Sequence, residues 1–268
     1  MRNAVENSIP KRAFTFIEAR PSEKIYEICI ALNDVCGAVA MAAKVLSDAK
    51  VNIRTSTLFI AEGADGFGYW ASFVDFSKAT TGIKQLEKNL RNLDFVEDVK
   101  VIKPSPLAYD AIHFPIIHGG SLAMIMPIEL FGSLFEEIEK ILTPSGFVAV
   151  FYNAGKKSGA FIATLLSKRY QLKGDTLSSA LVQATKALGW GQVEAFTIDK
   201  DRLVGKVKVR SCFEALLKFD RNDKVCHWTR GIVAGFLSEV IGKQVEAVEL
   251  KCAAAGDEIC EFEIKPKI

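Results

Sequence analysis

Four residues near the C-terminus, all with side chains that bind transition metals, constrain this chain more than any other feature of its sequence. Cys226 precedes an amphipathic segment, and Glu249, Cys252 and Cys260 follow that segment within a short stretch. Zinc binds thiolate and carboxylate ligands in tetrahedral geometry, and structural zinc sites are closed by four protein ligands. The sequence therefore predicts a structural zinc site that joins the start of a helix to a later pair of strands.

The spacing of these residues makes specific demands on the backbone. The stretch 253–257 is typical of a hairpin turn with Gly256 midway between Cys252 and Cys260, so we expect these two cysteines directly opposite each other. Glu249 and Cys252 have opposite parity in an extended strand. Both can face one ion only if the backbone bends or bulges between them.

Two other arrangements of the same residues remain open. Cys252 and Cys260 could form a cross-strand disulfide, which would leave Cys226 as a buried thiol. Alternatively His227, next to Cys226, could replace Glu249 as the fourth ligand. The remaining cysteines are far from the cluster in sequence, and we expect each to be a small buried hydrophobic residue: Cys29, Cys36 and Cys212.

The overall composition is that of an ordinary soluble globular protein. The chain has 268 residues, 49% hydrophobic and 25% charged, and its net charge of +2 creates no strong field for nucleic acid or anionic lipid. The N-terminus has no apolar signal core, and the most apolar stretch, 114–135, is interrupted by prolines and glycines. We expect a cytoplasmic protein with no membrane segment and no direct nucleic-acid binding, since neither a helix-turn-helix segment nor a basic stripe is evident.

The hydrophobic pattern of residues 24–103 alternates between strand and helix in the order βαββαβ. The expected strands are 25–32, 51–60, 69–75 and 96–102, and the expected helices are 39–46 and 83–93. Before this region we expect an N-terminal extension, residues 1–23, and after it a proline-containing linker, residues 104–112.

Two segments of this first domain resemble the ACT-domain signature. They are residues 33–39, at the start of the first helix, and residues 49–53, which follow it; Cys36 takes the place of the usual proline. The resemblance implies a ferredoxin-like fold, pairing into a homodimer and an amino acid bound at the loop, or else a domain used only for dimerisation. Backbone N–H groups at a helix start suit a carboxylate. The candidate contacts are therefore Asn33, Asp34, Val35, Gly37 and Ala38.

Residues 113–268 form the second domain, for which we expect a mixed α/β fold. The pattern predicts strands at 122–126, 146–152, 193–198, 204–209 and 245–250, and helices at 130–141, 159–166, 176–188 and 229–241. The last helix should end at Gly242 as its C-cap.

The end of the chain resembles the vinyl-reductase-type (4VR) domain, a small-molecule-binding module. Cys226 with 229–241, 245–252 and 256–262 carries the match, and earlier glycines support it from about residue 113 to 265. The resemblance implies a fold like that of TRAPP subunits. It also implies zinc on the four residues above, as in aromatic-sensing bacterial activators, beside an apolar effector pocket. Aromatic candidates for that pocket are Trp190 and Trp228.

Together these features predict an α+β regulatory protein that senses a small-molecule effector and acts through a partner. The ligand would be an amino acid at the ACT-like loop, a small apolar or aromatic compound in the 4VR pocket, or both. A reductase-type enzyme of the vinyl-reductase family is one alternative, and a non-catalytic assembly protein is another. The sequence has no dinucleotide fingerprint, and four ligands would leave zinc no open position, so we expect no catalytic residues.

Overall fold

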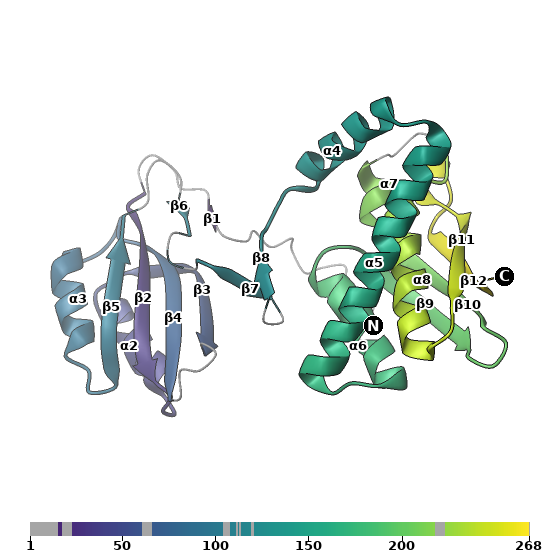
Figure 1. Ribbon diagram of the computed structural model, residues 1–268. Helices are drawn as coiled ribbons and strands as arrows, with labels where there is room; N and C mark the ends of the chain where they lie inside the picture. Colours follow the sequence, from purple (N-terminus) through teal and green to yellow (C-terminus); the bar gives the residue numbers. More distant parts are fainter. Residues whose placement is uncertain are drawn as a thin grey trace. The chain divides into compact units, whose positions relative to one another are not determined.

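The computed structural model describes residues 16–17, 23–60, 66–103, 108–110, 112, 114–118, 121–217 and 223–267. Most of the expected extension and linker, the histidine at position 113 and the turn before Gly66 lie outside these residues. The chain divides into two units, one ending at Ile116 and the other beginning at Ile117 (Figure 1).

The first unit is built around a four-stranded antiparallel sheet with the order β3-β4-β2-β5. The chain order is strand, helix, strand, strand, helix, strand, as predicted from the sequence pattern. A further short strand pair, β1 (Phe16–Ile17) with β6 (Ala108–Tyr109), belongs to the same unit. The six elements are β2 (Ile25–Asn33), α2 (Ala38–Asp48), β3 (Asn52–Ile60), β4 (Phe67–Asp75), α3 (Ile83–Arg91) and β5 (Val96–Ile102).

Alternation along β2 determines where the core of this unit lies. Ile28, Ile30 and Leu32 point to one face of the sheet, where they pack with Leu46 of α2 and Leu86 of α3. Successive side chains in a strand point to opposite faces, so this pattern buries one face under the two helices.

The second unit contains a second antiparallel sheet, with the order β11-β12-β10-β9. A short pair, β7 (Ile116–His118) with β8 (Ser121–Ala123), precedes its helices. The remaining elements are α4 (Ile128–Ile141), α5 (Pro144–Tyr170), α6 (Gly174–Ala187), β9 (Gln192–Asp199), β10 (Val204–Arg210), α7 (Phe213–Leu217), α8 (His227–Ile241), β11 (Val245–Lys251), the 3₁₀ turn η1 (Ala253–Ala255) and β12 (Cys260–Pro266).

Helix α8 is the central element of this unit, because it lies between the sheet and α5 (Figure 1). One side of it packs on the sheet through Val233, Ala234 and Leu237. It ends at Gly242, whose left-handed φ of 73° forms the predicted C-cap. Every residue from Gly231 to Ser238 is buried.

Glycines allow the backbones of α5 and α8 to touch. A Cβ on Gly235 would lie 2.0 Å from the carbonyl oxygen of Lys156, and one on Gly159 would lie 2.1 Å from that of Ile232. Gly155 and Gly231 are similarly close to the opposite backbone. The glycines of α5, which the sequence suggested to be a helix start, are therefore the contact surface of a helix crossing.

The prediction of a strand at 146–152 is wrong, since this stretch is the first part of the 27-residue helix α5. The aromatic and valine residues that favoured a strand instead include members of a cluster in which Phe147 and Phe151 pack against Phe135 of α4. The start of the helix is fixed by Thr143, whose hydroxyl accepts a hydrogen bond from the N–H of Gly146, and by Pro144 in the first turn.

No helix within the described ranges combines the length and the apolar content that crossing a membrane requires.

Candidate metal centre

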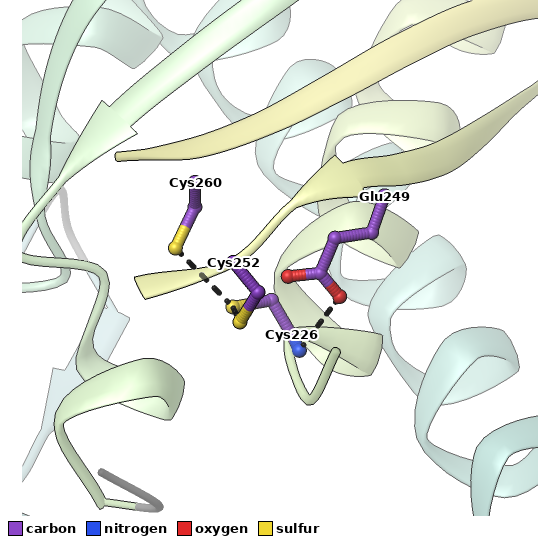
Figure 2. A group of neighbouring side chains, drawn as sticks. All are labelled: Cys226, Glu249, Cys252 and Cys260. Carbon is purple, nitrogen blue, oxygen red and sulfur yellow. Dashed lines mark hydrogen bonds between the residues drawn. The ribbon is translucent and has the colours of Figure 1, made fainter. Parts of the chain in front are cut away.

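The fold gathers the four predicted metal ligands into one buried cluster. Cys226 is the N-cap of α8, Glu249 lies in β11, Cys252 directly follows that strand, and Cys260 begins β12. One potential ligand atom from each residue lies within 4.8 Å of the others, as Figure 2 shows. The three cysteines are 0% exposed and Glu249 is 5% exposed.

The separations between sulfurs fit one tetrahedral ion. The Sγ atom of Cys226 lies 3.8 Å from that of Cys252 and 3.7 Å from that of Cys260. Zinc–sulfur bonds of about 2.3 Å in tetrahedral geometry place neighbouring ligand sulfurs about 3.8 Å apart. All six cysteines of the chain are free thiols, so the structure contains no disulfide between Cys252 and Cys260.

Glu249 supplies an acceptor that lacks a proton donor. Its Oε2 accepts a hydrogen bond of 3.1 Å from the backbone N–H of Cys226. Its Oε1 is buried and has no hydrogen-bond partner among the residues that the structure describes. Burial raises the pKa of this carboxyl to about 9. A cation at Oε1 would both satisfy the atom and favour its ionised form, so the donor set fits a metal ion.

The thiols also interact with one another. Hydrogen bonds from Cys226 and then Cys260 lower the pKa of Cys252, while the pKa values of the two donors are raised. Two protonated thiols thus support one thiolate. Three thiolates in this space would need a positive charge between them.

The predicted bulge between Glu249 and Cys252 is present. The register of β11 against β12 shifts between Glu249 and Lys251, and the chain then turns through η1, with Gly256 at φ 90°. The shift reverses the parity of the strand, so that Glu249 and Cys252 face the same point. The side chain of Asp257 fixes the turn by accepting a 2.8 Å hydrogen bond from the N–H of Cys252.

The expectation that Cys252 and Cys260 pair directly across a symmetric hairpin is wrong. Cys252 lies beyond the end of β11, and the strand partner of Cys260 is Val209 in β10. The 3₁₀ turn and the bulge make the connection asymmetric. Their sulfurs nevertheless meet, because the Cys252 side chain turns back toward the start of β12 (Figure 2).

Sequence reasoning missed a fifth side chain at this cluster. Cys212 follows β10, is fully buried, and its thiol interacts with those of Cys226 and Cys260. Its Sγ also lies 3.4 Å from the hydroxyl of Thr229. The pairing of β10 with β12 brings it there, and no spacing in the sequence indicates that pairing.

The other histidine and cysteine predictions have mixed outcomes. The ring of His227 lies edge-on to Phe147, 6.0 Å between centroids, and His227 is not part of the cluster that gathers within 4.8 Å in the described chain. Cys29 and Cys212 are buried, as expected, whereas Cys36 is exposed.

An apolar cavity of about 40 Å³ lies next to the cluster, between α6, α8 and the sheet. Trp190 lines it, while Trp228 does not and instead contacts Trp190 and Phe213 at ring distances of 5.8 and 5.5 Å. Only two lining side chains carry a hydroxyl and one an indole N–H, so the cavity favours apolar ligands. Its walls are Leu181, Val182, Thr185, Trp190, Val193, Phe196, Val207, Val209, Phe213, Thr229, Ile232 and Val233.

The candidate loop of the first unit surrounds the start of α2. Gly37 is the N-cap of that helix with a left-handed φ of 88°. Val35 is 51% exposed. The N–H groups of Asp34, Val35 and Ala38 already donate to carbonyl oxygens, at 2.9, 2.8 and 3.2 Å. Asn33 is at the end of β2, and its side-chain amide donates to Glu97.

Comparison with known proteins adds a family match in the second unit. Residues 206–266 match the family model of the vinyl-4-reductase (4VR) domain. The uncharacterized protein MJ0150 of Methanocaldococcus jannaschii is 26% identical over 145 residues, which cover 54% of this chain and 79% of that protein.

Two solved structures are similar to a comparable share of the chain. The phenol-responsive sensory domain of the transcription activator PoxR with phenol aligns with 20% identity and a TM-score of 0.48, covering 55% of this chain and 78% of that one. A vinyl-4-reductase family protein from Methanocaldococcus jannaschii aligns with 21% identity and a TM-score of 0.39, covering 55% and 85%. Because the family match spans all four clustered ligands, the second unit contains a 4VR domain.

Proposed function

We propose that this chain is a regulatory protein whose second unit binds a small, largely apolar molecule in the cavity beside a structural zinc ion. The observation that carries the proposal is the contact between the two features. Thr229 lines the cavity, and its hydroxyl lies beside the thiol of Cys212 at the edge of the metal cluster. A ligand in the cavity therefore lies one side chain away from the cluster.

Zinc would be held by Cys226, Glu249, Cys252 and Cys260. When bound, it supplies cross-linking of α8 to the β11–β12 connection and not a reactive water, because the four residues close its tetrahedral shell. This chain's residues do the remaining work: Asp257 orients Cys252, and the N–H of Cys226 orients the Glu249 carboxylate.

The size of the cavity indicates how a ligand would act. A volume of about 40 Å³ is far below the roughly 300–1,000 Å³ of a typical ligand site. A phenol-sized molecule would have to part the walls and move α6 or α8. PoxR responds to phenol, which makes phenol a suitable first probe for this chain.

The role of the first unit is a second, separate proposal. Residues 24–103 would be an ACT domain that forms the homodimer and binds an amino acid at residues 33–38. The order of its strands and helices supports this assignment. An amino-acid carboxylate would have to compete with the carbonyl oxygens that already accept from the loop N–H groups.

The test combines native mass spectrometry with thermal unfolding. The proposal expects one zinc ion per chain, and a rise in the unfolding temperature with phenol or a close analogue. Val193→Phe fills the cavity and should abolish the rise, while Val150→Phe, at an exposed position of α5, should preserve it. Stabilisation that survives Val193→Phe in a folded, zinc-loaded protein would place the ligand elsewhere and contradict the proposal.

A further inference from the structure

The metal cluster has more potential ligands than a single tetrahedral ion can use. Cys226, Glu249, Cys252 and Cys260 already supply four. Cys212 adds a fifth side chain, 0% exposed, whose thiol interacts with the Sγ atoms of Cys226 and Cys260. A buried thiol against two ligand sulfurs is within a small side-chain movement of the ion itself.

We propose that Cys212 is a reserve ligand that takes the place of Glu249 and converts the centre from three thiolates and a carboxylate to four thiolates. This inference rests on the proposed zinc site and goes beyond it by assigning a fifth residue. Cys226, Cys252 and Cys260 stay bound in both forms.

The exchange balances in charge and in protons. Cys212 gives up its thiol proton and binds the ion through Sγ, while Glu249 releases the ion and takes up one proton. Four anionic ligands surround a divalent ion before and after, so no uncompensated charge is created in the buried site. Both forms lie within the known ligand chemistry of zinc.

Cys212 also connects the centre to the cavity walls. Its Sγ lies 3.4 Å from the hydroxyl of Thr229, and the next residue is Phe213; both Thr229 and Phe213 line the cavity. The N–H of Phe213 donates to the carbonyl of Trp190, a third wall residue, at 3.1 Å. Movement of Cys212 toward the ion would therefore shift this wall, which makes the ligand set sensitive to what the cavity contains.

Cobalt(II) in place of zinc provides the test, because its near-ultraviolet sulfur-to-metal absorption grows with the number of bound thiolates. Wild type should show the three-thiolate intensity. Glu249→Ala should keep one cobalt per chain and gain intensity by about one third, since four thiolates replace three. The double variant Glu249→Ala with Cys212→Ser should lose that gain.

Two controls make the result specific to Cys212. Cys212→Ser alone should bind zinc one to one with the wild-type cobalt spectrum, because Glu249 remains. Glu249→Ala with Cys29→Ser removes another buried cysteine, in the first unit, and should keep the gain.

The outcomes separate this inference from the proposed function. A wild-type protein that binds neither zinc nor cobalt contradicts the metal centre as a whole. A wild-type protein with the three-thiolate spectrum, whose Glu249→Ala variant loses the metal or keeps the three-thiolate intensity, overturns only the role of Cys212.

Discussion

The carboxylate of Glu214 accepts a hydrogen bond of 2.6 Å from the backbone N–H of Thr229 and one of 3.0 Å from that of Trp228. A side chain from α7 thus caps the first turn of α8, two residues after the cysteine that begins the metal cluster. Free N–H groups at a helix start need such acceptors when they are shielded from water. Glu214 is 2% exposed, so no solvent would replace it.

Glu214→Gln should therefore destabilise the start of α8. The amide keeps one acceptor oxygen and turns its NH₂ group toward an N–H donor, so we expect a loss of about 1–3 kcal/mol. Hydrogen–deuterium exchange of peptides from α8 measures the change as faster exchange. Glu136→Gln, an exposed position in α4, is the matched control. Equal exchange in the two variants would show that the cap contributes nothing.

Chelation of the metal should destabilise the second unit selectively. Zinc would tie the start of α8 to β11 and β12, and its removal leaves three thiols and a carboxyl in a closed space. Calorimetry should show that one unfolding transition moves down by many degrees and recovers when zinc is restored. Cys260→Ser should behave like the chelated protein, and Cys29→Ser like the wild type. A chelator that leaves every transition unchanged argues against a structural ion.

Gly235→Ala should disrupt the crossing of α5 and α8. The new methyl group would meet the Lys156 carbonyl at 2.0 Å, and two packed backbones cannot separate without opening the core. We expect a loss of about 3 kcal/mol or more, measured by urea unfolding. Gly132→Ala is the control, because there the nearest atom is the end of the flexible Leu217 side chain. A similar loss in both variants would mean that helix propensity or local strain, and not the crossing, controls the effect.

The buried thiol of Cys29 should make the first unit less stable at alkaline pH. Burial raises the pKa of Cys29 from 9.0 to about 11. Between these values the unfolded chain loses the proton while the folded chain retains it, so stability falls as pH rises from about 9 to 11. Cys29→Ala should flatten this part of the curve of unfolding free energy against pH. The exposed Cys36 offers the comparison, and Cys36→Ala should leave the slope as it is.

The sequence contained enough information to predict the cluster and the bulge beside it. Ligand type singled out Cys226 and Cys260, and strand parity required a break between Glu249 and Cys252, which the register of β11 contains. Both are local properties, readable from a few neighbouring residues. The start of α8 at Cys226 and its end at Gly242 were predictable for the same reason.

What could not be predicted depends on contacts between distant segments. Phe147 and Phe151 suit a strand by themselves and form a helix because α4 offers aromatic partners. Cys212 looked isolated, since nothing in the sequence shows that β10 pairs with β12. The glycines of α5 gain their meaning only from those of α8.

The capped start of α8 also determines what the protein must release in order to bind its metal. Three thiols and the Glu249 carboxyl meet there in a volume closed to water, and without a cation most of them hold protons. Zinc uptake is then an exchange of one divalent ion for several protons, so the apparent affinity falls steeply with acidity. The same few side chains that join helix and strands make the integrity of the second unit a function of both zinc supply and pH.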